Sequence, residues 1–187
     1  MGLGVIKTKT DLTNHLVALR LAAIYNIFAL TCLHQFCKDA RDGKRDLRSL
    51  STHLPEGEID FLSFIEQLVK DFGGPDQVEY TKRNATIAFQ RNYLKEVFRI
   101  TQSYCHRFNQ KIRFSQQPWH DFAVVAVNSM SHDFRISFRH IDQNKLPISY
   151  KGFRLTKELE DKPAPMSLDI LVALADDVIN YAIRELV

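Results

Sequence analysis

The stretch that decides the fold is WHDFAVVAVNSMS, residues 119–131, in which apolar side chains recur at helical spacing. Trp119, Phe122 and Ala126 fall on one face of a helix, because residues three and four apart are neighbours on its surface. The valines alone would favour a strand, but the spacing predicts a helix. Pro118 stands just before it, and proline is well placed at the start of a helix.

Residues that follow this helix change to a two-residue period. Apolar and polar side chains alternate over residues 134–139, FRISFR, which is typical of a strand. A second candidate strand spans residues 147–155, and residues 142–145, DQNK, suit the loop between the two. The pattern predicts a small β-hairpin over about residues 134–155. After it, Ser167 is placed as the N-cap of an amphipathic helix that runs to the end of the chain.

Helical spacing also marks three segments nearer the N-terminus. The candidate helices are residues 11–40, 58–72 and from about Val78 or Thr81 to Asn109. Thr10 is the expected N-cap of the first, and residues 43–57 are expected to form a loop. The predicted fold is therefore all-α in the main. We expect one domain over residues 1–187, a bundle of four to five helices with the hairpin inserted before the last helix.

The composition is that of an ordinary globular domain. The chain has 187 residues, of which 45% are hydrophobic and 25% are charged, so it can bury enough apolar surface to fold without covalent crosslinks. Three cysteines make a disulfide scaffold unexpected and point to a reducing compartment, so we expect a cytoplasmic protein. The net charge of +3 permits a nucleic-acid partner without requiring one.

The most apolar stretch runs from Leu16 to Leu33 and is close to the length of a membrane span. Arg20 and Asn26 lie inside it, and an arginine in the middle of a membrane costs about 2.5–3.5 kcal/mol on insertion scales. We therefore expect this stretch to form a buried central helix of a soluble protein. No apolar run at the start of the sequence is long enough for a secretory signal.

Three cations lie at four-residue spacing on the predicted third long helix. Arg91, Lys95 and Arg99 fall along one edge of that helix. A solvated edge is the simpler interpretation. The alternative is an edge that faces the phosphates of an RNA, with Arg91 and Lys95 as RNA-binding residues.

Asn128 and His132 are four residues apart, so on a continuous helix they would project from the same face. They lie near the end of the predicted helix, where the helix dipole favours a protonated imidazole. A histidine there is suited to exchange a proton with a ribose 2′-hydroxyl or a leaving oxygen, with the asparagine amide orienting it. The alternative is a capping or surface pair, which is the commoner use of this spacing.

These residues belong to a pattern that resembles a known superfamily. Residues 125–138, VAVNSMSHDFRISF, residues 146–156, LPISYKGFRLT, and the amphipathic tail are similar to the C-terminal half of a HEPN domain. Its motif is an arginine, four to six residues and a histidine, commonly Arg-Asn-x-x-x-His. Asn128 and His132 match it. The arginine position is Val127, and the alternative spacings fall on Ala126 and Val125, so the arginine is absent. The resemblance covers the last third of the chain by motif and the earlier helices by their bundle character.

HEPN domains are helical bundles, usually homodimers, in which two copies of the motif face each other. Many are metal-independent endoribonucleases of toxin–antitoxin, abortive-infection or CRISPR systems, and others lack the motif and bind partner proteins. The arginine stabilises charge on the scissile phosphate and the histidine is the acid or base. The resemblance therefore implies an RNA-associated defence or toxin–antitoxin protein, with activity weakened or lost because a missing charge-stabilising group typically costs about 10²–10³ in rate.

Two alternatives remain open from the sequence. In an active endoribonuclease, His132 would be the acid or base, Asn128 its orienting partner, and Arg135 or Arg139 a substitute for the missing arginine. Arg154 would complete a cationic rim that attracts RNA. In a non-catalytic module, the same residues would be a vestige and the fold would serve dimerisation or the binding of an antitoxin or other operon partner. A DNA-binding regulator ranks last because no helix-turn-helix signature is present.

No metal or cofactor is expected. The sequence has no Cys-x-x-Cys pair, no glycine-rich phosphate loop and no His-Glu-x-x-His helix. Arg113 and His120 form a second formal match to the motif, with six residues between them. Gln116, Gln117 and Pro118 intervene, so the two would not share one helical face, and we interpret this match as chance.

Overall fold

The computed structural model describes residues 6–44, 75–132 and 134–187. These residues are mainly α-helical, with one two-stranded antiparallel hairpin before the C-terminal helix, which confirms the predicted fold class. The chain divides into two compact units, one of residues 1–23 with 89–187 and the other of residues 24–88. The expectation of a single domain over the whole chain stays a prediction.

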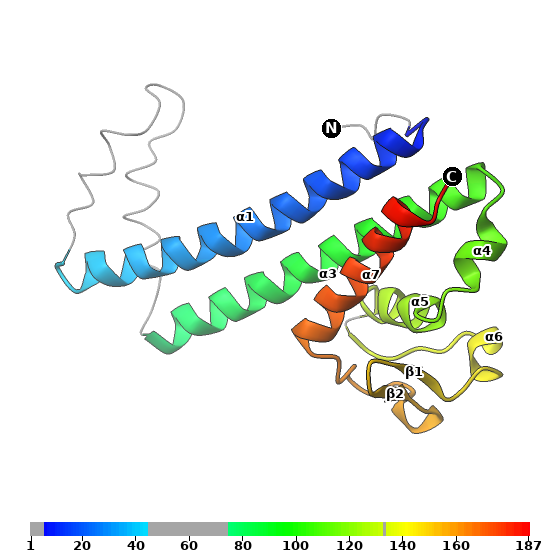
Figure 1. Ribbon diagram of the computed structural model, residues 1–187. Coiled ribbons are helices and arrows are strands. Elements are labelled where there is room, and N and C mark those ends of the chain that lie inside the picture. The colour runs from blue at the N-terminus through cyan, green and yellow to red at the C-terminus, as the bar shows by residue number, and fades with distance from the viewer. Residues whose placement is uncertain (1–5, 45–74, 133) are drawn as a thin grey trace. The chain divides into compact units, whose positions relative to one another are not determined.

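The elements of the described residues are shown in Figure 1. The helices are α1 (Lys9–Arg41), α3 (Pro75–Arg107), α4 (Lys111–Ser115), α5 (His120–Ser129), α6 (His140–Gln143) and α7 (Leu168–Arg184). The strands are β1 (Ile148–Tyr150) and β2 (Phe153–Leu155), followed by the 3₁₀ turn η2 (Lys157–Leu159). Four predicted helices are thus confirmed in type. The predicted helix over residues 58–72 and most of the loop over residues 43–57 lie outside the described residues.

The start of α1 is fixed by two reciprocal hydrogen bonds. The Thr8 hydroxyl accepts from the backbone N–H of Asp11 at 3.1 Å, and the Asp11 carboxylate accepts from the N–H of Thr8 at 2.9 Å. The expected N-cap, Thr10, was therefore wrong. The reason is the residue three positions later: Thr8 is followed by an acidic side chain at that position, whereas Thr10 is followed there by Thr13.

Much of the apolar surface of α1 is exposed. Leu12, Leu16 and Ala23 are buried. The exposed large apolar side chains of this helix are Val17, Leu21, Ile24, Tyr25 and Phe28. Residues Lys9–Cys32 form a helix long and apolar enough to cross a membrane, and 11% of its most apolar window is buried. The expectation of a buried central helix was therefore wrong for most of this stretch, because its apolar residues occupy more than one face.

Helix α3 begins at Pro75, earlier than the predicted Val78 or Thr81. A proline fits the first turn of a helix, because its missing N–H would have no helical partner there. Later in α3, Leu94, Val97 and Cys105 are buried, as their spacing predicted. This second half of α3 forms one wall of the core of the first unit.

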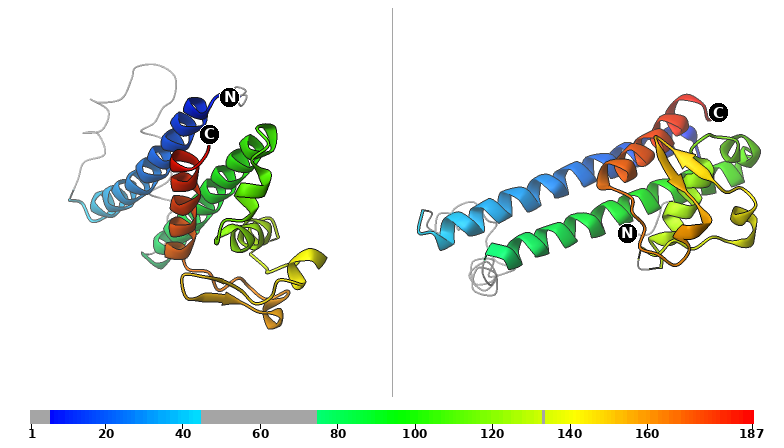
Figure 2. Two further views of the ribbon diagram at one scale, coloured as in Figure 1. Left: turned by 45° about the vertical axis from the view of Figure 1, so that its right-hand side comes forward. Right: turned by 90° about the horizontal axis from the view of Figure 1, so that it is seen from below.

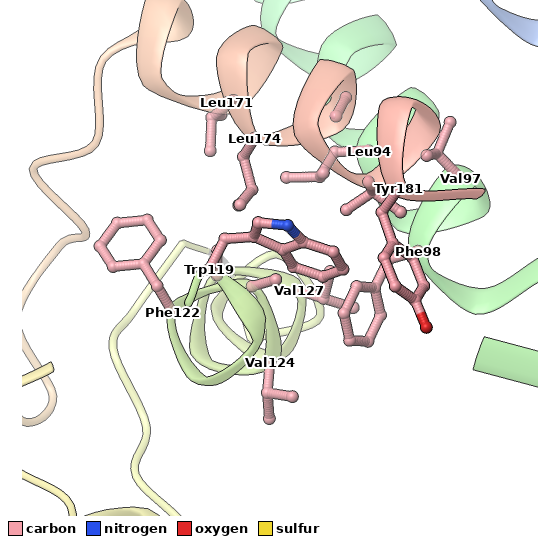
Figure 3. Packing of buried hydrophobic residues seen from close by; sticks show 14 of the residues in the cluster. Leu94, Val97, Phe98, Trp119, Phe122, Val124, Val127, Leu171, Leu174 and Tyr181 are labelled. Atoms are coloured by element: carbon pink, nitrogen blue, oxygen red, sulfur yellow. The ribbon is translucent and has the colours of Figure 1, made fainter. Parts of the chain in front are cut away.

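The core of the first unit lies where α3, α5 and α7 meet. Figure 3 shows Trp119 pointing from the start of α5 toward α7, with Leu174 and Tyr181 near it. The Trp119 ring centroid is 5.5 Å from that of Phe114 and 5.8 Å from that of Tyr181. The buried aromatic contacts hold α5 in place, and with it the turn that follows.

The hairpin lies beside α5 on another side of the core (Figure 2). The Phe122 ring of α5 packs on Tyr150 at 5.1 Å and on Phe153 at 5.8 Å. The Tyr150 hydroxyl donates to the Asp177 carboxylate of α7 at 2.7 Å. At the start of α7, the Ser167 hydroxyl accepts from the N–H of Ile170, which confirms the predicted N-cap.

The hairpin is shorter than predicted. Strands β1 and β2 pair from Ile148 opposite Leu155 to Tyr150 opposite Phe153, so both strands come from the second half of the predicted hairpin. The predicted strand over residues 134–139 is wrong. That segment alternates in burial but forms a single bridge, Arg135 with Pro163. The predicted loop over residues 142–145 is also wrong in part, because helix α6 occupies His140–Gln143.

Candidate functional site

The candidate site begins at the turn that ends α5. The helix stops at Ser129, and the N–H groups of Ser131 and His132 donate to the carbonyls of Asn128 and Ser129 at 2.9 and 3.0 Å. The expectation that Asn128 and His132 share one helical face was therefore wrong, since the helix ends before His132. Asn128 is half-buried and His132 is exposed. The imidazole is thus accessible to a large substrate.

Phe134 holds this turn in an unusual backbone conformation. Its φ is +59°, in the left-handed region that bulky residues seldom adopt. Its N–H donates to the Ser129 carbonyl at 2.9 Å, and its carbonyl accepts from Ala164 at 2.6 Å. The guanidinium of Arg91, from α3, lies 5.3 Å from the centre of the Phe134 ring, a cation–π contact. Arg91 therefore contacts a residue two positions after His132, a contact that its place in the sequence did not reveal.

Arg135 is oriented by the backbone. Its guanidinium Nη1 donates to the carbonyl of Asp161 at 2.7 Å, and its own N–H donates to the carbonyl of His132 at 2.9 Å. The side chain is exposed. A carbonyl carries no net charge, so this bond fixes the guanidinium without neutralising it and leaves further N–H donors for a ligand.

Arg139 is engaged in a different contact. Its Nε and Nη2 each donate to a carboxylate oxygen of Asp142 at 2.8 Å, while the Asp142 carboxylate also accepts from the N–H of Arg139. Asp142 is only 2% exposed. Burial opposes its ionisation, but the hydrogen bonds and charge of Arg139 prevail and keep the pKa of Asp142 below its ordinary value. The pair starts α6, so Arg139 is poorly placed to replace the missing arginine.

The other predicted RNA-binding cations differ in their surroundings. Arg154 lies exposed on β2, opposite Ser149, and its side chain forms no hydrogen bond or ion pair within the described ranges. Lys95 lies one turn beyond Arg91 on α3 and lines a groove between α3 and α1. The structure thus brings Arg91 to the segment that carries Asn128, His132 and Arg135, through its contact with Phe134. The charge of Arg139 is instead neutralised by Asp142.

The positions that the motif would give to its arginine are all in the core. Val127 is 6% exposed, and Ala126 and Val125 are fully buried. Val127 packs in the layer shown in Figure 3, between α5 and α3. A guanidinium at any of these positions would enter an apolar environment, where an unpaired charge is strongly unfavourable. The absence of the arginine is therefore matched by the packing around it.

The second formal match to the motif does not form a site. Arg113 lies 3.8 Å from the Glu185 carboxylate, at the end of α7. The His120 ring packs on Phe114 at 5.1 Å, and its Nδ1 is 3.3 Å from Asp121. Burial lowers the pKa of His120, and Asp121 opposes this in part. The two residues thus have separate partners, in agreement with a chance match.

Sequence reasoning overlooked one polar cluster. The Asp121 carboxylate binds both His120 and the ammonium of Lys145, which is 2.6 Å away. The adjacent His-Asp pair was visible in the sequence, but Lys145 comes from the segment interpreted as a hairpin loop. No signal in the sequence joined it to the start of α5.

Among the described residues, no three His, Cys, Asp or Glu side chains are arranged to hold a metal ion. Comparisons of the chain with protein-family models, with curated proteins and with solved structures find no match.

Proposed function

We propose that this chain is a HEPN-like, RNA-associated protein of a defence or toxin–antitoxin type system, with weakened or lost ribonuclease activity. The observation that carries the proposal is the turn after α5. It carries an exposed His132 and, three residues later, an exposed Arg135 whose guanidinium is held by the Asp161 carbonyl. The guanidinium of Arg91 lies on the ring of Phe134 in the same turn. An exposed imidazole on a turn that carries one guanidinium group and is contacted by another suits a phosphodiester.

Cleavage of RNA at such a site needs only proton transfers and charge stabilisation. A base removes the proton of the 2′-hydroxyl, the 2′-oxygen bonds to phosphorus, and the bond to the 5′-oxygen breaks as that oxygen receives a proton. The products are a 2′,3′-cyclic phosphate and a 5′-hydroxyl. His132 is suited to one transfer, and a second His132 to the other if the chain forms the homodimer that the resemblance implies.

The weakness of the site follows from its cations. The expected arginine positions are buried, and Arg139 is neutralised by Asp142. Arg135 is left as the substitute, three residues beyond His132 instead of before it, with one donor already bound to a carbonyl. Loss of a preorganised charge-stabilising donor typically costs about 10²–10³ in rate. We therefore expect binding of RNA to outlast efficient cleavage.

The test is incubation of the purified chain with total RNA in EDTA. Slow cleavage should fall at least about 10²-fold in His132→Ala, because an acid or base typically contributes 10²–10⁴. It should fall in Arg135→Gln as well. The matched control is His140→Ala, since His140 is also exposed and lies on α6. Cleavage that persists in His132→Ala, or the absence of both cleavage and RNA binding at low salt, would reject the proposal.

A second candidate is a non-catalytic module that dimerises or binds an operon partner such as an antitoxin. The exposed apolar side chains of α1 favour it, since Leu21 is 49% exposed, Tyr25 69% and Phe28 66%. Exposed large apolar side chains at helical spacing are a common mark of a protein interface. Sedimentation of the wild type and of Leu21→Glu tests it. Asn14→Glu, at an exposed polar position of the same helix, is the control. If self-association and partner binding are the same in Leu21→Glu as in Asn14→Glu and the wild type, α1 is not that interface.

A further inference from the structure

A groove lies between α1 and α3 within the first unit. Its volume is about 470 Å³, within the range of sites for small organic ligands. Leu19 and Ala23 of α1 and Phe89 of α3 form its apolar wall. Asn92, Lys95 and Arg99, all from α3, form its polar edge.

The polar edge carries two cations, Lys95 and Arg99, and the carboxylate of Glu96. Lys95 and Arg99 are one turn apart on α3, so their side chains are neighbours on its surface. Neither forms a hydrogen bond or an ion pair with any described residue, and the same holds for Glu96, which also lines the groove. Two cations at this spacing suit a phosphate group, which accepts charge-assisted hydrogen bonds from both.

One of the residues that line the groove is a buried tyrosine. Tyr93 is buried and lines the groove, and its hydroxyl has no hydrogen-bond partner in the part of the chain that the structure describes. Burial raises the pKa of Tyr93 to about 12, so the hydroxyl keeps its proton at neutral pH. An unpaired buried hydroxyl is unfavourable. This one is closed to solvent, so a ligand in the groove would reach it only after the surrounding side chains had moved.

The remaining groups suit a nucleobase. Phe89 is half-buried in the wall and offers an aromatic ring, on which a base can stack. Asn92 is exposed at the edge, and its amide can both donate to and accept from the edge of a base. An inorganic anion would use the cations and leave the wall and the amide unoccupied, whereas a nucleotide uses all three.

We propose that this groove binds one nucleotide unit, with its phosphate on Lys95 and Arg99 and its base against Phe89 and Asn92. The unit can belong to single-stranded RNA or be a free mononucleotide. In the RNA form the inference rests on the proposed function, because Arg91 continues the row of cations from the groove to the turn of His132. In the mononucleotide form it does not.

The experiment is calorimetric titration of the full chain with a ribonucleoside 5′-monophosphate and, separately, with a ten-residue single-stranded RNA. Arg99→Gln should weaken the binding of each about tenfold, because it removes one charge-assisted contact. Ala22→Phe should weaken both by a similar factor, since it fills the groove without changing the charge. Lys111→Gln, an exposed lysine of α4 outside the groove, is the matched control and should leave the mononucleotide affinity unchanged.

Several results would overturn the inference. These are binding of neither ligand, equal losses in Arg99→Gln and Lys111→Gln, unaltered affinity in Ala22→Phe with helical content retained, and competition by inorganic phosphate as strong as that by the nucleotide. If RNA is cleaved or bound and the groove variants have no effect on either, the groove is not a binding site, but the proposed function is unaffected. If the mononucleotide binds and RNA does not, the inference about the groove holds and the proposed function is rejected.

Discussion

At the scale of single residues, the candidate site is defined as much by what is buried as by what is exposed. Val127 takes the place of the motif arginine inside the core, while His132, two residues past the helix-capping Met130, is in solvent. The identity of both residues was evident in the sequence. Their environments were not, because the last turn of a helix is set by the packing around it.

The burial of Val127 predicts that the motif cannot be restored by one substitution. Val127→Arg should lower the free energy of unfolding by at least about 3 kcal/mol, because it buries an unpaired charge. Val127→Met, of similar length but uncharged, should cost less, about 1–3 kcal/mol. Urea denaturation measures both. A stable Val127→Arg variant with faster RNA cleavage would show that the position opens to the site.

The Arg139–Asp142 pair predicts a dependence of stability on pH. The pKa of Asp142 is lowered in the folded state, so its contribution is present above its unfolded pKa and is lost as the pH falls through the folded value. The melting temperature should therefore decrease when the pH is lowered below about 4, the ordinary pKa of an aspartate. In Asp142→Asn this part of the fall should be absent, with a lower melting temperature at pH 7. Identical acid profiles for the two proteins would contradict the assignment.

At the scale of elements, spacing predicted the helices well and the strands in part. A helix satisfies its own backbone, so residues 119–131 and the tail could be assigned from local pattern alone. A strand needs a partner elsewhere. Residues 134–139 alternate in burial, but the bridge of Arg135 with Pro163 is the one strand pairing that they form within the described ranges. The backbone groups of Phe134 and Ile136 bond to residues 161–164, far along the chain. For the same reason, α6 could not be foreseen, since it depends on the Arg139–Asp142 contact.

The same limit applied to the faces of α1. Its apolar residues predicted a helix, and a helix is what they form. Whether an apolar face is buried depends on tertiary structure. The helix was therefore predicted correctly from the sequence, and its burial was not. Within the site, residue types could be predicted from the motif, while the cation–π contact of Arg91 and the compensation of Arg139 required coordinates.

The N-terminus of α1 gives a test at this scale. Thr8→Ala should lower the free energy of unfolding by about 1 kcal/mol, because it leaves the N–H of Asp11 without its acceptor. Thr10→Ala should change it by less than about 0.5 kcal/mol, since alanine is a good helix former and Thr10 is exposed. Thermal denaturation of the two variants checks the difference. A larger effect at Thr10 would place the start of the helix two residues later.

At the scale of the whole molecule, the groups that we propose to contact RNA lie in the first compact unit. The core between α3, α5 and α7 fixes the turn of His132, and α3 carries cations both at this turn and along the groove. A net charge of +3 is modest, so affinity for RNA should come from these local clusters and should fall with salt. The RNA surface that we propose is therefore confined to these clusters.

The most direct measurement is NMR of the histidine ring protons during titration with a single-stranded RNA made uncleavable by 2′-deoxy substitution. The chain has seven histidines, and His132→Ala identifies the relevant signal. If RNA approaches the turn after α5, the His132 resonance should shift in a saturable way, and that of His140, also exposed, should shift much less. RNA that binds while the His132 signal stays in place would contradict the account.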